Sequence, residues 1–265
     1  MKREAICHIR AKFTISYSRA CKIIGYCRTN QYYKKIMPQK DNVLKAIISG
    51  VIGTSRKGRE KVIRLVQAKH PQISHSKIRR VYTREGFSLF KRLKKRVKNN
   101  PANPIEVPLA PNKEWAIDFM SDSLTNGRRF RTLNVIEQYN RSCLGITPAF
   151  SIPARKVTEV LNRLIQTHGK PERIRTDNGP EFTSKAFQLW LENNKIKWAP
   201  IQKGKPQQNA IVERFNRTYR EDVLDASLFD SIQMVDKITQ DWIDDYNAVR
   251  PHQALNYMTP LQYGT

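Results

Sequence analysis

Three acidic residues stand out in this sequence because of the positions that they occupy. Asp118 lies within WAIDFM, an apolar stretch that alternates as a strand does. Asp177 ends a second short strand pattern and enters a DNGP turn, and Glu213 lies inside the helical pattern of residues 208–225. A carboxylate at an apolar strand position is costly unless it is paired or bound to a metal ion. Hard cations such as Mg²⁺ take oxygen ligands and leave room for a substrate phosphate, so the three residues are candidate metal ligands.

Each of these residues also has an ordinary interpretation. Asp118 could be a satisfied polar group near a strand end, and the DNGP segment could be a plain turn. Glu213 could pair with Arg217 four residues later, as residues on helix surfaces commonly do. The interpretation as a metal site therefore rests on the combination of all three carboxylates with the elements that carry them.

The elements that must position these residues follow from the hydrophobic pattern after residue 112. The pattern predicts the order β-β-β-α-β-α-β-α, and a further amphipathic helix over residues 231–252. This order indicates an α/β core, a mixed five-stranded sheet with flanking helices that begins with an antiparallel meander. The expected strands cover residues 113–122, 130–140, 144–151, 172–177 and 195–201, and the expected helices cover residues 154–169, 184–194 and 208–225.

The charge of the chain is strongly uneven. The net charge is +25, and residues 1–100 hold 27 Lys and Arg against 4 Asp and Glu, whereas the remaining residues hold 21 against 19. A positive field of this size favours a polyanion, most commonly nucleic acid, although a ribosomal-type or membrane-surface protein would also fit. Arg79, Arg80 and Arg84 recur at helical spacing, and Lys94, Lys95 and Arg96 form a basic run, so we expect these six residues to contact DNA.

The N-terminal part reads as small helical units. Residues 14–36 predict two short helices with a tight turn, which are the ingredients of a helix-turn-helix. We expect a helix-turn-helix-like segment over residues 1–40, then a basic helical DNA-binding domain of winged-helix or helix-turn-helix type over 41–97. A linker over 98–111, the catalytic core over 112–226 and a C-terminal helical extension over 227–265 complete the predicted organisation.

Several classes are excluded by composition. The sequence has no run of about 18 apolar residues, and its basic N-terminus lacks the apolar segment of a secretory signal. None of the four cysteines has zinc-finger spacing, so we expect free thiols in a reducing cytoplasm and no membrane association.

The motifs resemble those of a known family. WAIDFM, RTDNGPEF and KGKPQQNAIVERFNRTYREDVLD are similar to the three blocks of the integrase core. The 35 residues between Asp177 and Glu213 match the D,D(35)E pattern of retroviral integrases and insertion-sequence transposases. YNAVRPHQALNYMTPLQY resembles the C-terminal signature of the bacterial insertion-sequence family IS-three, and SRACKIIGYCRTNQYYKK resembles the start of that family's second reading frame, OrfB.

This resemblance implies a ribonuclease-H-like fold and a DDE transposase that cleaves and joins DNA strands. Two Mg²⁺ ions, with Mn²⁺ as a substitute, would be held by Asp118, Asp177 and Glu213, with Asp118 bridging both. The attacking oxygen would be water in the first cut and a DNA 3′-hydroxyl in strand transfer. The partners implied are double-stranded DNA at transposon ends and target, further copies of the chain in a dimer or larger assembly, and an OrfA product. The expected location is the bacterial cytoplasm, on the nucleoid.

Further DNA contacts are predicted beside the metal. Asn178 follows Asp177 directly and helps to shape its turn. On the helix of Glu213, helical spacing places four polar residues on its face, where they could hold phosphates or bases or form i,i+4 ion pairs. They are Asn209, Asn216, Arg217 and Arg220.

Two other functions remain open from the sequence. The chain could be a DNA-binding OrfB subunit or regulator without catalytic activity of its own, which the basic first hundred residues suit equally well. It could also be a ribonuclease H or a Holliday-junction nuclease, since these use similar carboxylates. A protein that only binds DNA does not need the three carboxylates, so they disfavour the first alternative. The 35-residue spacing and the YNAVRPH segment disfavour the nucleases.

Overall fold

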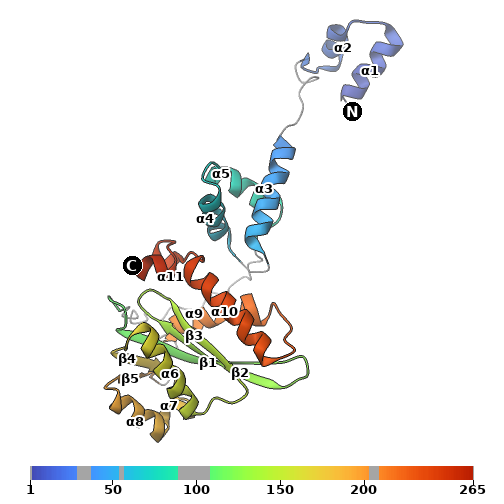
Figure 1. The fold of residues 1–265 in the computed structure, drawn as a ribbon. Coiled ribbons are helices and arrows are strands. Elements are labelled where there is room, and N and C mark those ends of the chain that lie inside the picture. Colours follow the sequence, from blue (N-terminus) through green and yellow to red (C-terminus); the bar gives the residue numbers. More distant parts are fainter. Residues whose placement is uncertain (1, 29–36, 54–56, 89–107, 203–208, 265) are drawn as a thin grey trace. The chain divides into compact units, whose positions relative to one another are not determined.

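The computed structural model describes residues 2–28, 37–53, 57–88, 108–202 and 209–264 (Figure 1). The chain divides into two compact units, Met1–Ile47 and Ile48–Thr265, and each is described here by itself. Most of the predicted linker, and Lys94, Lys95 and Arg96 before it, lie outside the described residues. Among the described helices, none is both long and apolar enough to span a bilayer.

The first unit is built around a pair of short helices. Helix α1 (Lys2–Phe13) packs against α2 (Tyr17–Ile24), and Ile6, Ala20 and Cys21 are buried between them. Helix α2 ends at Gly25, whose positive φ of 61° closes the last turn in the left-handed conformation. The charged pattern of α1 did not predict a helix, and the predicted helix after Gly25 lies outside the described residues.

More helices follow before the sheet. Helix α3 (Met37–Ile52) crosses the division between the two units. Helix α4 (Arg59–Lys69) and α5 (His75–Arg84) pack against each other through their apolar faces. The N-terminal region is therefore all-helical, as expected. The buried side chains of α4 and α5 are Val62, Ile63, Val66, Ile78, Val81 and Tyr82.

The remainder of the chain forms a five-stranded mixed sheet with the strand order β3-β2-β1-β4-β5. The first three strands are antiparallel neighbours, whereas β4 lies parallel to β1 and β5 lies parallel to β4. This arrangement confirms the predicted mixed five-stranded sheet that begins with an antiparallel meander. The strands are β1 (Glu114–Ser123), β2 (Arg129–Glu137), β3 (Cys143–Ala149), β4 (Arg173–Thr176) and β5 (Lys197–Pro200).

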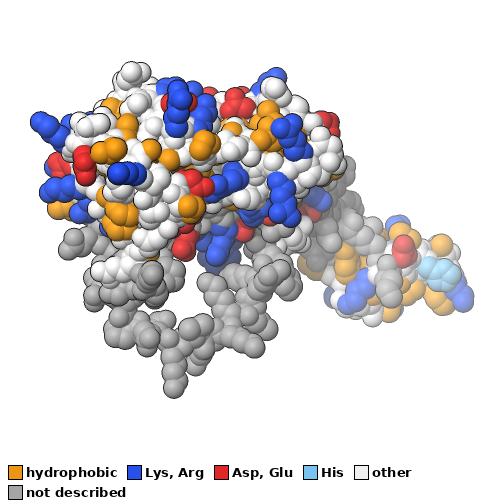
Figure 2. All heavy atoms as spheres, turned by 90° about the horizontal axis from the view of Figure 1, so that it is seen from below, with side chains coloured by type: hydrophobic (Ala, Val, Ile, Leu, Met, Phe, Trp, Pro, Cys, Tyr) orange, Lys and Arg blue, Asp and Glu red, His pale blue; other side chains and the backbone are white. Residues whose placement is uncertain are grey.

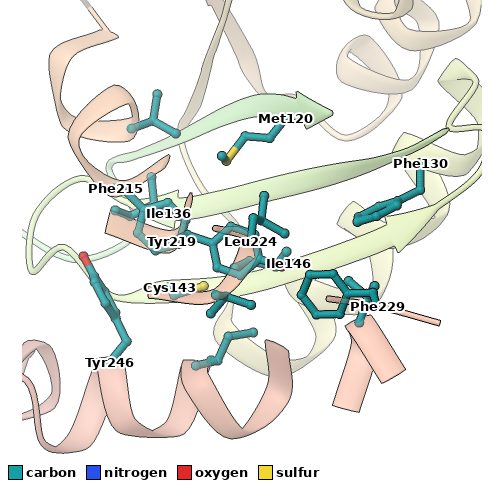
Figure 3. Packing of buried hydrophobic residues seen from close by; sticks show 14 of the residues in the cluster. Met120, Phe130, Ile136, Cys143, Ile146, Phe215, Tyr219, Leu224, Phe229 and Tyr246 are labelled. Carbon is teal, nitrogen blue, oxygen red and sulfur yellow. The ribbon is translucent and has the colours of Figure 1, made fainter. Parts of the chain in front are cut away.

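Helices cover both faces of this sheet (Figure 1). One face packs against α6 (Ala154–His168), α7 (Pro180–Thr183) and α8 (Lys185–Asn193) through a cluster that includes Trp115 and Ile117. The other face packs against α9 (Ala210–Tyr219) and α10 (Ile232–Ala248). Figure 3 shows this second cluster, in which Phe215 and Tyr219 lie beside strand residues such as Ile136 and Ile146.

The long helix predicted over residues 208–225 is regular over only part of that range. Helix α9 ends at Tyr219 and continues as a π-helical segment, η3 (Arg220–Leu224). Because a π-turn contains more residues than an α-turn, the buried face shifts around the helix axis. Val223 and Leu224 are buried in the same cluster as α9.

The C-terminal helix is also shorter than predicted. Helix α10 ends at Ala248 rather than at residue 252, because Pro251 disfavours helical backbone in the residue before it. The chain then makes a short 3₁₀ turn, η4 (Gln253–Leu255), and a final helix, α11 (Pro260–Gly264).

Candidate active site

Asp118 lies on the face of β1 that α9 covers. Successive residues of a strand point to opposite faces, and Ala116 and Met120, on either side of Asp118 at a spacing of two, belong to the cluster that contains α9. Two hydrogen bonds fix its carboxylate. The backbone N–H of Phe119 donates to Oδ1 at 2.9 Å, and Nδ2 of Asn216 donates to Oδ2 at 2.8 Å.

Asp177 lies beside Asp118 because of the strand register. Strand β4 runs parallel to β1 with Ala116 opposite Arg175, so two residues further along each strand lead to Asp118 and Asp177. Adjacent strands are about 4.8 Å apart, so Asp177 follows the end of β4 next to the middle of β1, where Asp118 lies. The side chain of Asp177 is exposed, and its Oδ1 accepts a hydrogen bond from the N–H of Gly179 at 3.0 Å.

Glu213 projects from the first turn of α9. The buried stripe of this helix consists of Val212, Phe215, Asn216 and Tyr219, and Glu213 lies exposed at its border. Among the described residues no ion pair joins Glu213 to Arg217, so the structure gives no support to the alternative of a simple surface pair.

The electrostatics of Asp118 reflect its surroundings. The pKa of its carboxyl group is raised to about 6, mainly by burial and also by repulsion from Asp177 and Glu213, whereas the hydrogen bonds from Phe119 and Asn216 oppose the rise. Within the described part of the chain, however, the acidic residues do not form a ready-made cluster of three metal ligands. The two observations are compatible, because electrostatic repulsion acts over longer distances than metal ligation does.

The polar residues predicted on the face of Glu213 separate into two groups. Asn209 and Asn216 are buried, and Asn216 faces Asp118 rather than the solvent. Arg217 is exposed. The guanidinium group of Arg220 is 38% exposed and donates to the carbonyl oxygen of Ser121 at 2.9 Å, so it is held by the chain itself.

The other predicted DNA contacts lie on the surface. Asn178 is exposed, although its Nδ2 donates to the carbonyl oxygen of Ile201 at 2.8 Å and so ties the Asp177 turn to the end of β5. Arg79, Arg80 and Arg84 are exposed on α5, where Arg84 also pairs with its neighbour Glu85.

The charges of the sheet-containing part are mixed. On the face seen in Figure 2, the Lys and Arg side chains lie among Asp and Glu side chains. This agrees with the near balance of 21 basic and 19 acidic residues after residue 100. The strong excess of positive charge is therefore a property of the N-terminal hundred residues.

A set of aromatic and charged contacts on the face of β1 opposite Asp118 was not predicted from the sequence. Phe119 stacks on Phe182 with the ring centroids 5.2 Å apart, and the guanidinium carbon of Arg131 lies 4.0 Å from the Phe119 centroid. Arg131 also pairs with Glu181 in the short helix α7 that follows the Asp177 turn. These contacts join the strand of Asp118 to the turn of Asp177. A periodic pattern reports contacts within one element, whereas these residues come from three separate elements. Their contacts were therefore not visible in the sequence.

The C-terminal segment holds the helix of Glu213 in place. Arg250, from the YNAVRPH segment, forms a buried ion pair with Asp222 of η3, with side chains 6% and 2% exposed. Asn247, from the same segment, accepts from the backbone N–H of Cys143 and donates to its carbonyl oxygen, both at 2.9 Å. The segment that served only as a family signature in the sequence therefore connects the end of α10 to β3 and to η3, which follows the helix of Glu213.

Comparisons with known proteins show which family the chain is similar to. One model described as integrase core domain matches residues 108–206, and another with the same description matches residues 194–260. The chain is 34% identical over 256 residues to the insertion element IS407 uncharacterized 31.7 kDa protein of Burkholderia multivorans, covering 96% of this chain and 92% of that protein. It is 26% identical over 185 residues to the transposase for insertion sequence element IS904 of Lactococcus lactis, covering 69% and 70%.

Among solved structures, the cryo-EM structure of the simian T-cell lymphotropic virus intasome in complex with PP2A regulatory subunit B56 gamma contains a similar chain. The TM-score is 0.50 at 17% identity, with 82% of this chain and 74% of that chain covered. At this identity the similarity concerns the fold, and it agrees with the expected ribonuclease-H-like core.

The fold and the matched domain define the class of protein, which is that of the integrase-type polynucleotidyl transferases. Within this class, the chain belongs to the family of DDE transposases of insertion sequences. The family normally uses divalent metal ions and acts on DNA.

Proposed function

We propose that this chain cuts DNA strands at the ends of an insertion sequence and joins them to target DNA in a reaction that depends on divalent metal ions. One observation carries the proposal. Asp118 is a partly buried carboxyl group whose pKa is raised to about 6 by burial and by the charges of Asp177 and Glu213. Three carboxylates that repel one another across two strands and a helix are costly for a protein, unless a cation relieves the repulsion.

The donor set fits a hard divalent cation. All three candidate ligands are carboxylates, Asp177 and Glu213 are exposed, and the orientation of Asp118 is fixed by two hydrogen bonds. We assign Asp118, Asp177 and Glu213 as ligands of two Mg²⁺ ions, with Mn²⁺ as a substitute. When bound, such ions activate the attacking oxygen and stabilise the leaving oxygen of a phosphodiester exchange.

The side chains of the protein then have separate tasks. Asp118 must be deprotonated to act as a ligand, which its raised pKa permits at pH 7 and above. The Gly179 N–H and the Asn178 bridge to Ile201 hold the turn that presents Asp177. The attacking group is water in strand cleavage and a DNA 3′-hydroxyl in strand transfer, so no Ser or Tyr nucleophile of the protein is required.

Exposed basic and polar side chains would bind the DNA. Asn178 and Arg217 lie near the carboxylates, and Arg79, Arg80 and Arg84 lie on α5, with Lys94, Lys95 and Arg96 as further candidates in the basic run. Because Asn209, Asn216 and Arg220 are buried or engaged within the chain, any DNA contact of theirs requires a rearrangement. We further propose that the chain acts as a dimer or a larger assembly on DNA, because two transposon ends must be brought together, and that an OrfA product is a possible partner.

The test is a cleavage and strand-transfer assay with labelled DNA from the ends of the element that encodes the chain. The assay compares the wild-type chain with Glu213→Gln in the presence of Mg²⁺. Glu192→Gln is the matched control, because Glu192 is an exposed glutamate on α8, on the other side of the sheet. We expect metal-dependent nicking and joining by the wild type and the control, and loss of both products in Glu213→Gln.

Other outcomes would point elsewhere. Salt-sensitive DNA binding without any product from the wild type would favour the non-catalytic OrfB subunit. Hydrolysis without joining to a 3′-hydroxyl would favour a nuclease. Equal activity of Glu213→Gln and the wild type would show that the assignment of this residue is wrong.

A further inference from the structure

A buried chain of two side-chain amides ends on Asp118. Asn134 of β2 lies directly opposite Asp118 in the antiparallel register and is fully buried. Its Nδ2 donates to Oδ1 of Asn216 at 2.7 Å, and Nδ2 of Asn216 donates to Oδ2 of Asp118 at 2.8 Å. Three residues from β2, α9 and β1 are thus connected by two short hydrogen bonds.

The direction of this chain follows from the chemistry of its ends. An ionised carboxylate only accepts hydrogen bonds, so Asn216 must turn its NH₂ group toward Asp118. The carbonyl oxygen of Asn216 then points away from Asp118 and requires a donor. Asn134 supplies that donor, and it thereby selects one of the two orientations of the Asn216 amide.

Asn134 is a poor choice of residue for stability alone. Its side chain lies on the sheet face that carries the apolar cluster, and within the described part of the chain its Oδ1 has no hydrogen-bond partner. A buried polar atom without a partner costs about 1–3 kcal/mol. Leucine has nearly the same shape and would remove this unpartnered oxygen, but Oδ1 of Asn216 would then lose its donor. The connection to Asn216, rather than apolar packing, therefore explains the amide at this position.

We propose that Asn134 is a positioning residue of the active site, which acts through Asn216 to hold the Asp118 carboxylate in the orientation that binds a divalent cation. This inference rests on the proposed function only in taking Asp118 as a metal ligand. Side chains that orient a metal ligand typically change metal affinity or activity by about 10- to 100-fold when they are replaced.

The neighbouring strand position provides a matched control. Thr132 lies two residues before Asn134 on the same face of β2, is buried, and has a hydroxyl oxygen without a partner among the described residues. It lies opposite Met120 and has no connection to Asp118. Thr132→Val therefore removes a buried polar group without touching the amide chain.

The experiment compares the full wild-type chain with Asn134→Leu, Asn134→Asp and Thr132→Val. For each protein, thermal unfolding gives the stability and titration calorimetry gives the Mn²⁺ affinity. We expect Thr132→Val to unfold at or above the wild-type temperature without metal. Asn134→Leu should unfold near the wild-type temperature, because it removes the unpartnered Oδ1 of Asn134 but leaves Oδ1 of Asn216 without its donor. We expect only the two Asn134 variants to weaken Mn²⁺ binding, by about 10-fold or more. Asn134→Asp should be the weaker binder, because a carboxylate at this position accepts from Asn216 and turns its carbonyl oxygen toward Asp118.

The measurement of Mn²⁺ affinity tests this inference independently of the DNA cleavage that tests the proposed function. If the wild type binds Mn²⁺ and Asn134→Leu binds it more weakly, the positioning role stands even when neither protein cleaves DNA. If Asn134→Leu binds Mn²⁺ as the wild type does, the positioning role is wrong even when the wild type is an active transposase. Mn²⁺ binding that Thr132→Val weakens as much as Asn134→Leu does would show a general effect of substitution in the core and would overturn the inference, as would a wild type that does not bind Mn²⁺.

Discussion

Replacing Asp118 by asparagine is expected to stabilise the metal-free protein. The pKa of Asp118 is raised to about 6 from the ordinary value of 3.8, first by burial and then by the repulsion of Asp177 and Glu213. A folded state with a raised pKa binds the proton more tightly than the unfolded state does. The wild type therefore loses stability as the pH rises from about 4 through about 6, and the loss is complete above the folded pKa.

The size of the effect follows from the shift. A shift of about 2 pH units corresponds to about 3 kcal/mol, which is an upper value because Asp118 keeps some contact with solvent. The asparagine amide can still accept from Asn216 but loses the hydrogen bond from the Phe119 N–H, which offsets about 1 kcal/mol. The expected net gain is about 1–2 kcal/mol at pH 8, or roughly 2–8 °C in the unfolding temperature of a chain of this size.

The assay is thermal or urea unfolding with EDTA between pH 4.5 and 8.5. The control is Asp244→Asn, which replaces an exposed carboxylate on α10. The gain of Asp118→Asn should grow between about pH 4 and 6.5 and then stay constant, while the control shows no such rise. Added Mn²⁺ should reverse the order, because a ligand at 100 times its Kd stabilises the wild type by about 2.7 kcal/mol. A variant that is less stable at pH 8, or a difference that is equal at pH 5 and pH 8, would refute the reasoning.

Three further predictions concern Gly179 in the turn of Asp177, the buried ion pair of Arg250, and His252. In Gly179→Ala the new Cβ would lie 3.0 Å from Oδ1 of Asp177, so we expect about 10- to 100-fold slower DNA cleavage with little change in unfolding temperature. Arg250→Met leaves Asp222 buried without its partner and should cost about 3–5 kcal/mol in urea unfolding, and adding Asp222→Leu should restore most of it. Burial lowers the pKa of His252 to about 3, so its ring should stay neutral in NMR titrations down to pH 5, and His252→Asn should reduce the loss of stability as the pH falls below about 6.5.

These predictions follow from how the site is divided among distant segments. Asp118 and Asp177 come from adjacent parallel strands, and Glu213 comes from the helix that covers them. The ion pair of Arg250 fixes the end of that helix from a segment 28 residues away from Asp222. We therefore expect a substitution of one of these supporting residues to change the positions of the carboxylates, even though the carboxylates themselves are not substituted.

The sequence by itself determined the order of the elements in the sheet-containing part, and it singled out three carboxylates as candidate ligands. Periodicity is a local property, and the alternation around Asp118 and the apolar spacing around Glu213 survive in the structure as β1 and α9. The spacing of the acidic residues, the sequence blocks around them and the YNAVRPH segment were together sufficient to predict the family, which the comparisons confirm.

Only the tertiary structure decided which side chains surround these carboxylates. Asn216 was expected to face DNA, but the packing of Phe215 and Tyr219 against the sheet rotates it inward to Asp118. Asn134 gave no signal as a single asparagine within a strand pattern, because its role depends on the register of β1 and β2 and on the position of α9 together. Contacts between residues 16, 82 and 98 positions apart in the chain are set by packing free energy over the whole core, which no local pattern encodes.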